Sequence, residues 1–388
     1  MSPNPEVIGG DEGERAGRRI KRSLGEVFDP QNNALNAWRL ILATGVIVWH
    51  SWPLTGRTIS FEPVHQLLRD GWVDGFFAVS GFLITWSWFK HRRTRDYFIA
   101  RGLRLLPGLW VCLVVTAFVI APIAVLIQGG SASKLLLSRA PFDYVLGNSA
   151  VLLTEHDIAG TPSGIPWLGE WNGSLWTLFW EAMCYTAIAG LGVVGLLRRK
   201  WVIPGLLALM IYWSAILPPY APFIEAPPGA EIQLDAATQQ LVTSGIAARF
   251  GLMFLAGALL YRFRKVIPAR WSLVALSIAI VLAASTLPNY RVVGAIPLAY
   301  AIIVSGALLR HRRLRLKTDL SYGVYIYAFP IQQLMVICGL AFLNPVVFAM
   351  IAALATLPLA AMSWFVVEKP AIALKSRLRR KQAQVSRR

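Results

Sequence analysis

The chain has 388 residues, of which 56% are hydrophobic and 15% charged, and its mean hydropathy is +0.53. This composition excludes an ordinary soluble globular protein and predicts an all-α integral membrane protein. The formal net charge of +18 resembles that of nucleic-acid-binding proteins. Because the basic residues are grouped in alternate loops, we attribute this charge to membrane topology and expect no nucleic-acid partner.

Apolar windows of the length that crosses a bilayer recur along the whole chain. They span residues 36–52, 72–89, 105–127, 174–197, 201–217, 243–261, 271–287, 292–309, 320–342 and 346–367. We therefore predict about ten transmembrane helices in a single membrane domain over residues 35–372. No pair of matching half-chains is visible, which weakens a transporter built from inverted repeats.

Lysine and arginine gather in every second loop. The groups lie at residues 15–22, 90–104, 198–200, 262–270, 310–317 and 369–388. By the positive-inside rule these loops face the cytoplasm, so both termini are predicted to be cytoplasmic. We expect a disordered tail over residues 1–34, a basic cytoplasmic tail over residues 373–388, and a first span that acts as a signal anchor.

Two outer loops, residues 128–173 and 218–242, are long. Loops of this length in a compact protein are generally functional or disordered. The tryptophans Trp167, Trp171 and Trp176 favour a folded cap at the outer membrane interface. An acceptor substrate could enter there.

No metal site is predicted. Cys112, Cys184 and Cys338 each lie within a span without a neighbouring ligand, so we expect them to pack in the core. The run Glu-His-Asp at 155–157 has metal-binding residue types, but consecutive residues rarely bind one ion, and we interpret it as solvated loop.

The first span contains both an arginine and a histidine. Arg39 and His50 are eleven residues apart, or very nearly three helical turns, which places both on one helix face. Ionisable residues are costly within a bilayer and usually mark a functional site. Counting depth from the span ends places Asp74, Glu181 and Arg249 in the same outer layer as His50.

This layer suits proton-transfer chemistry. Histidine is the natural general base at neutral pH, and we assign Glu181 to hold its other ring nitrogen. Structural alternatives are also open: Asp74 caps the second helix, Glu181 forms an ion pair with Arg249, and Ser80 with Gly81 forms a close helix contact.

At the cytoplasmic end, Arg101 and Arg104 are three residues apart and therefore adjacent on one helical face. Arg39 enters the membrane nearby. Three guanidinium groups suit a polyphosphate, because their planar forks bind phosphate oxygens bidentately. We expect a nucleotide-linked acyl donor here, although Arg101 and Arg104 could also be topology charges.

Taken in chain order, these strings resemble the membrane acyltransferase 3 family, whose members acylate cell-surface sugars and some secondary metabolites. The likeness covers residues 35–372. Its strings are Arg39-x10-His50, VDGFFAVSGFL at 73–83, Arg101-x-x-Arg104, SLWTLFWEAMCY at 174–185, SYGVYIYAFP at 321–330 and VEKP at 367–370. One departure is Ala328, which stands where many members have a histidine.

The resemblance implies transfer of an acyl group, often acetyl, from cytosolic acyl-CoA to a hydroxyl of a sugar, glycan or glycosylated small molecule at or beyond the membrane. It implies essential roles for Arg39, His50, Arg101 and Arg104. It also implies a multi-pass protein of a bacterial plasma (inner) membrane.

We therefore predict an integral membrane O-acyltransferase. The predicted site comprises catalytic His50, Glu181, Asp74 and Ser80, donor-binding Arg39, Arg101 and Arg104, and acceptor-binding Arg249, Trp176 and Tyr185. Direct attack by the acceptor and an acyl-imidazole relay are both open at this stage. The alternatives are a transporter or flippase for a glycan or lipid-linked intermediate and, third, a membrane glycosyltransferase.

Overall fold

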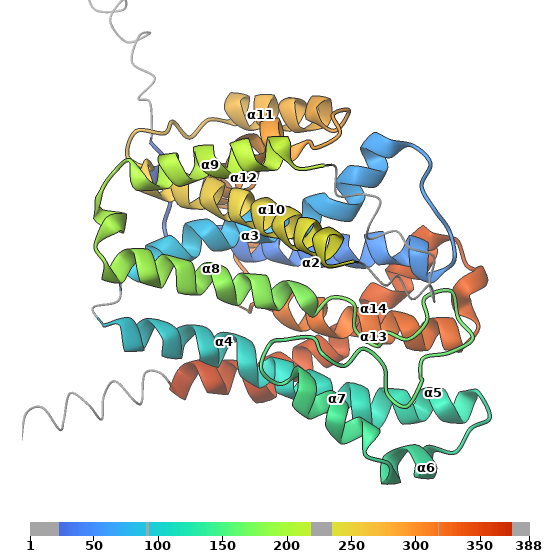
Figure 1. Cartoon of the computed structure of the whole chain (residues 1–388). Coiled ribbons are helices and arrows are strands. Elements are labelled where there is room, and N and C mark those ends of the chain that lie inside the picture. Colours follow the sequence, from blue (N-terminus) through green and yellow to red (C-terminus); the bar gives the residue numbers. More distant parts are fainter. Residues whose placement is uncertain (1–22, 91–92, 219–234, 317, 375–388) are drawn as a thin grey trace, which may run out of the picture.

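The computed structural model describes residues 23–90, 93–218, 235–316 and 318–374 (Figure 1). Within these ranges the regular structure is helical, and the remaining backbone pairing consists of two isolated bridges. The predicted all-α fold is confirmed.

Each predicted apolar window falls on a long helix or helical run. These are α2 (Leu35–Leu54), α3 (Glu62–Lys90), α4 (Thr94–Val115) continued through Thr116–Ile120 into α5 (Ala121–Ile127), α8 (Trp176–Val193), α9 (Val202–Ile216), α10 (Ala236–Arg262), α11 (Trp271–Ala284), α12 (Arg291–Leu308), α13 (Ser321–Ile337), and α14 (Pro345–Ser363) continued through Trp364–Glu368. The short helices are α1 (Leu24–Val27), α6 (Ala132–Leu137) and α7 (Ala140–Asn148).

Four of the helical runs are long and apolar enough to cross a membrane. They are Thr94–Ile127, Ala236–Arg262, Arg291–Leu308 and Pro345–Leu374. Helices α9 and α11 are apolar but have only 15 and 14 residues. Helices α2, α3 and α8 are long enough to cross a membrane, but they are less apolar because they carry the polar residues of the predicted site. The number of spans and the side on which the termini lie therefore stay predictions.

The predicted N-terminal tail is ordered from Ser23 onward. Leu24 is fully buried, and its backbone N–H donates to the carbonyl of Ile267 at 2.8 Å. The prediction of disorder is thus wrong for residues 23–34, because Leu24 and Val27 find an apolar site beside the segment that follows α10. Residues 1–22 and 375–388 lie outside the described residues, as does 219–234 of the second long loop.

Helices α3 and α10 pack so closely that each requires a glycine. A Cβ atom on Gly81 would lie 1.9 Å from the carbonyl oxygen of Phe254, and one on Gly257 would lie 1.8 Å from that of Ala78. Small residues allow such backbone approach between membrane helices. The close-contact alternative for Gly81 is confirmed.

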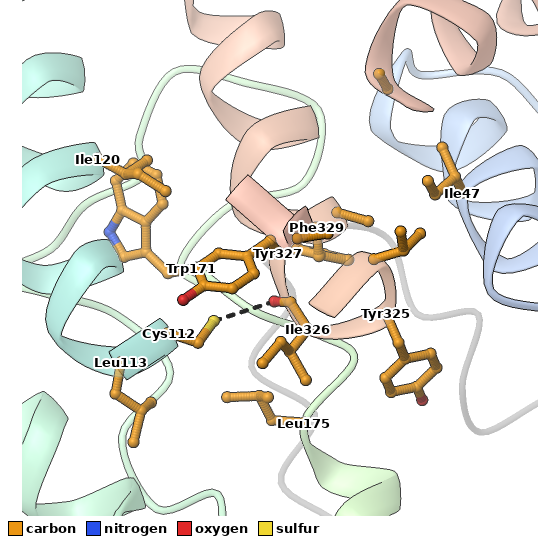
Figure 2. Packing of buried hydrophobic residues seen from close by; sticks show 14 of the residues in the cluster. Ile47, Cys112, Leu113, Ile120, Trp171, Leu175, Tyr325, Ile326, Tyr327 and Phe329 are labelled. Carbon is orange, nitrogen blue, oxygen red and sulfur yellow. Dashed lines mark hydrogen bonds between the residues drawn. The ribbon is translucent and has the colours of Figure 1, made fainter. Parts of the chain in front are cut away.

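The first long loop, residues 128–173, forms a folded cap over the core between α4 and α13 (Figure 2). Trp171 from the cap is fully buried, and its indole N–H donates to the hydroxyl of Thr161 at 3.1 Å. Cys112 is buried beneath Trp171, and its thiol donates a hydrogen bond to the carbonyl of Ile326 at 3.2 Å. Trp171 is therefore a core residue, whereas Cys338, predicted to be in the core, is exposed.

Candidate active site

The cationic end of the site lies where α2 and α4 meet the start of α13. The guanidinium groups of Arg39 and Arg104 both bind the carboxylate of Asp319, and the hydroxyl of Ser321 donates to its other oxygen. Burial alone would raise the pKa of Asp319, but the two guanidiniums and Ser321 outweigh it and lower this pKa below its usual value. Glu368 lies 3.8 Å from Arg104.

The predicted grouping of Arg39 with Arg104 is thus present, together with two carboxylates that the sequence analysis did not select. Glu368 had a signal, because it belongs to the VEKP string. The sequence contains no local signal for Asp319, because its pairing with Arg39 joins residues 280 positions apart.

Arg101, one turn before Arg104, has a different environment. Its guanidinium lies over the ring of Tyr185, 5.9 Å from the ring centre. Its Nε atom is buried without a hydrogen-bond partner among the described residues. Buried polar atoms are normally satisfied, so this atom is a candidate donor to an anionic ligand.

A cavity of about 40 Å³ extends inward from Arg39 between α2, α3, α8 and α13. The hydroxyls of Ser80 and Tyr185 both donate to Oε1 of Glu181, the first at 3.1 Å. Tyr325 and Arg39 also line the cavity, whose volume suffices for a few water molecules. Of the predicted residues, the structure therefore brings together Arg39, Ser80, Glu181 and Tyr185.

His50 lies at the opposite end of α2 from Arg39. Its ring meets that of Phe329 edge to face, with 5.0 Å between centres, and Phe329 meets Trp167 at 5.8 Å. The indole N–H of Trp167 donates to Glu170 at 2.9 Å, and Glu170 is the carboxylate whose charge acts on His50. The predicted contact between His50 and Glu181 is not found, because the acidic partner comes from the cap.

Helix α13 links these two parts. Tyr325 lines the cavity and Phe329 contacts His50, and the two residues are one helical turn, about 6 Å, apart along α13. Arg39 also binds at the start of α13, so the predicted common face of Arg39 and His50 is the face turned to α13. His50 accordingly lies about one turn beyond the outer end of the cavity.

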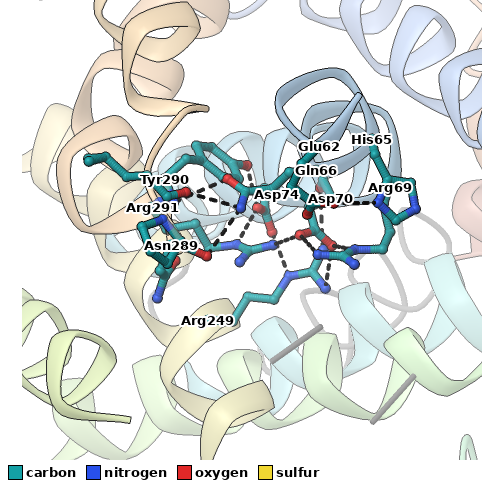
Figure 3. Close-up of polar contacts among 12 residues, drawn as sticks. Glu62, His65, Gln66, Arg69, Asp70, Asp74, Arg249, Asn289, Tyr290 and Arg291 are labelled. Atoms are coloured by element: carbon teal, nitrogen blue, oxygen red, sulfur yellow. Dashed lines mark hydrogen bonds and ion pairs between the residues drawn. The ribbon is translucent and has the colours of Figure 1, made fainter. Parts of the chain in front are cut away.

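Asp74 and Arg249 belong to a separate, buried ion network (Figure 3). Asp74 accepts from Nε of Arg249 at 2.9 Å, from Nε of Arg291 at 2.6 Å and from the hydroxyl of Tyr290 at 2.5 Å. Asp70 pairs with the same two arginines at 3.1 and 2.5 Å.

This network changes how two of the predicted residues are interpreted. Both carboxylate oxygens of Asp74 are occupied, and Arg249 bridges the two aspartates, so the geometry gives them a structural role. The alternative of Asp74 as a helix cap is wrong, since α3 begins twelve residues earlier, at Glu62. The spacing of Asp70 and Asp74, four apart on one helical face, was the signal for this network.

The predicted acceptor-binding residues do not form one surface. The ring of Trp176 packs against Phe250 of α10, with 5.5 Å between ring centres. Tyr185 lies between Arg101 and Glu181, on the donor side of the cavity.

In the cap, His156 contacts the carboxylate oxygen of Glu170 that Trp167 does not bind, with 3.4 Å between Nδ1 and Oε1. This contact is the main cause of the raised pKa of His156. The run at 155–157 thus supplies an ionisable partner for Glu170.

Comparison with known proteins identifies the family. A family model of acyltransferase domains matches residues 32–365, which is most of the chain. The chain belongs to the acyltransferase 3 family. This acyltransferase is 26% identical to Nodulation protein 10 of Rhizobium leguminosarum bv. viciae, over 89% of its own length and 95% of the relative. It is 25% identical to an O-acetyl transferase of Shigella phage Sf6, over 87% of its length and 96% of the relative.

No solved structure matches this acyltransferase. The predicted family and the predicted enzyme class are confirmed, and membership favours an acyltransferase over the transporter alternative.

Proposed function

We propose that this acyltransferase moves an acetyl group from cytosolic acetyl-CoA to a hydroxyl of a sugar or glycan at or beyond the outer face of the membrane. The observation that carries the proposal is the course of α2 along α13. Arg39 stands in a group of arginines at one end, His50 stands at the other, and a cavity that contains Ser80 and Glu181 lies between them. The name of the phage relative supports acetyl as the group and oxygen as the acceptor atom.

Donor binding is assigned to the arginine end. The unpartnered Nε of Arg101 offers a donor that the protein itself does not use, and Arg39 and Arg104 add positive charge beside it. Guanidinium groups in this arrangement suit the oxygen acceptors of an acyl-CoA, which are its phosphates and the carbonyl oxygens of its pantetheine arm and thioester. The thioester would then reach the cavity beside Ser80, and this cavity must widen to admit it.

His50 is assigned as the general base. Its imidazole takes the proton of the acceptor hydroxyl while the hydroxyl oxygen attacks the thioester carbonyl. The C–S bond then breaks, the imidazolium gives its proton to the leaving sulfur, and coenzyme A departs as the thiol. The charge of Glu170 stabilises the imidazolium that forms. We assign the oxyanion contact to Ser80, whose hydroxyl would rotate from Glu181 to the oxyanion, because Arg249 is held by two aspartates in the ion network. An acyl-imidazole relay through His50 would use the same residues.

The test is transfer of radiolabelled acetyl from acetyl-CoA to glycan in membranes that contain equal amounts of wild type, His50→Ala or His311→Ala. General bases contribute roughly 100-fold to 10,000-fold, so His50→Ala should lose at least about 100-fold. His311 is an exposed histidine outside the site, so the control variant His311→Ala should transfer acetyl at the wild-type rate. Equal transfer by wild type and His50→Ala would refute the mechanism.

A further inference from the structure

A larger cavity, of about 220 Å³, lies apart from the one at Glu181. It is formed where α3 ends, α4 begins and α8 ends. Its walls include Trp88, Arg93, Thr94, Tyr97, Gly192 and Arg198. The loops on either side of the cavity belong to the basic groups at residues 90–104 and 198–200, which are predicted to face the cytoplasm.

One wall of this cavity is aromatic: Trp88 is partly exposed, and the fully buried Tyr97 packs against it. Trp88 and Tyr97 meet edge to face with 5.2 Å between ring centres, and the hydroxyl of Tyr97 donates to the carbonyl of Tyr185 at 3.1 Å. A Cβ atom on Gly192 would lie 2.0 Å from the indole of Trp88, so the glycine leaves room for the ring. Fixed aromatic surfaces of this kind stack nucleic-acid bases with little preference for sequence.

The other wall carries positive charge. Arg93 and Arg198 line the cavity from two different elements, and both are exposed to the solvent. Helix α4 starts at Thr94 and has 22 residues, and the side chain of Arg93 makes no capping hydrogen bond. The positive end of the α4 dipole and the two guanidiniums favour phosphate at the same place.

The two cavities lie along one face of α8. Glu181 and Gly192 are eleven residues apart, so they lie on one face about 16 Å apart along the axis. Tyr185 lies between them on that face: its hydroxyl binds Glu181 and its carbonyl binds Tyr97. Arg101, with its unpartnered Nε, lies over the Tyr185 ring.

We propose that the cavity at Trp88 and Arg198 binds the adenosine phosphate end of the acyl-CoA donor. The pantetheine arm then runs along α8, past Arg101 and Tyr185, and places the thioester in the cavity at Glu181. The proposal rests on the proposed function, and it uses three features of the donor: an aromatic base, anionic phosphates, and a thioester at the far end of a flexible arm.

The first test compares two donors, acetyl-CoA and S-acetylpantetheine, which lacks the nucleotide. The double variant Arg93→Ala/Arg198→Ala removes the charges that line the cavity. The matched control, Arg95→Ala/Arg199→Ala, removes exposed neighbours that do not line it. We expect the first variant to raise KM for acetyl-CoA roughly tenfold: it removes two charged contacts, but both arginines are exposed, so each contact contributes less than a buried one. Its KM for S-acetylpantetheine, and both KM values of the control, should match wild type.

A change of equal size for both donors, or no change for acetyl-CoA, would overturn the proposal. The measurements use nanodiscs of phosphatidylcholine and nanodiscs with added anionic lipid. A change seen only with anionic lipid would assign the cavity to lipid headgroups and would also overturn it.

The second test does not depend on catalysis. Calorimetry should show that adenosine 3′,5′-bisphosphate binds the purified wild type and binds the Arg93→Ala/Arg198→Ala variant roughly tenfold more weakly. If the nucleotide binds in this way but no acetyl is transferred, the proposed function fails and the nucleotide site stands. If the nucleotide does not bind, or binds both proteins equally, the site is refuted whatever the activity.

Discussion

Replacing Asp74 by asparagine removes one of the two negative charges that hold Arg249 and Arg291 together. The carboxylate is fully buried and accepts from both arginines and from Tyr290. Breaking one partner of a buried ion pair leaves an uncompensated charge and costs about 3–5 kcal/mol. We expect Asp74→Asn to lower the free energy of unfolding by this amount.

The matched control is Asp143→Asn. Nε of Arg139 lies 3.0 Å from Oδ1 of Asp143, nearly the geometry of the Arg249–Asp74 contact, but these side chains are 89% and 43% exposed. An exposed pair of this kind contributes only about 0.5 kcal/mol or less. The two substitutions therefore break a similar Arg–Asp contact, but Asp74 is buried and accepts from three donors, whereas Asp143 is exposed and accepts from Arg139.

Both variants and the wild type would be unfolded in the same detergent with increasing urea or dodecyl sulfate, and acetyl transfer would be measured per folded molecule. The structural role predicts a stability loss for Asp74→Asn several times that of Asp143→Asn. An Asp74→Asn protein that is as stable as wild type but inactive would refute this reasoning and return Asp74 to the catalytic group.

Two further predictions concern the cap and the helix contact. Because the folded-state pKa of His156 is raised, its pairing with Glu170 stabilises the cap fully below about pH 6.5 and is lost as the pH rises through the raised pKa. Hydrogen–deuterium exchange of residues 149–175 should therefore quicken at alkaline pH beyond the intrinsic rate, and His156→Gln should abolish this difference; an unchanged profile would contradict the pairing. Gly257→Ala places a Cβ 1.8 Å from the carbonyl oxygen of Ala78 and should cost about 3 kcal/mol or more, whereas Gly190→Ala meets nothing within 4 Å. Gel filtration of fluorescently tagged protein should show little folded Gly257→Ala and normal Gly190→Ala, and a normal Gly257→Ala peak would show that the helices can separate at no cost.

Local features of the site could be predicted from the sequence. The length of an apolar run is a local property, and each predicted window falls on a helix. The common face of Arg39 and His50 follows from helical periodicity alone. The pairing of Asp74 with Arg249 was also within reach, because depth along a span can be counted from its ends.

Rotation of the helices about their axes could not be predicted. Glu181 shares a predicted depth with His50, yet it points to Ser80, because α8 packs against α3. The carboxylate near His50 is that of Glu170, which comes from an irregular loop. Such a loop has no periodic pattern from which the inward-facing side chains could be predicted. The role of Asp319 likewise cannot be predicted from its local sequence, because the two arginines that it binds come from α2 and α4.

The two walls of the reaction cavity differ in how firmly they are held. Helix α3 is fixed on its far side twice, by the glycine contact with α10 and by the ions that tie it to α10 and α12. Helix α8 ends in a stretch with Gly190, Gly192 and Gly195, the last with a φ of +75° that other residues rarely adopt. A thioester that enters a space of about 40 Å³ has to push one wall aside. We expect α8 to yield, so the rate of donor entry would be set by the stiffness of the glycine-containing end of α8 and not by the helix that carries Ser80.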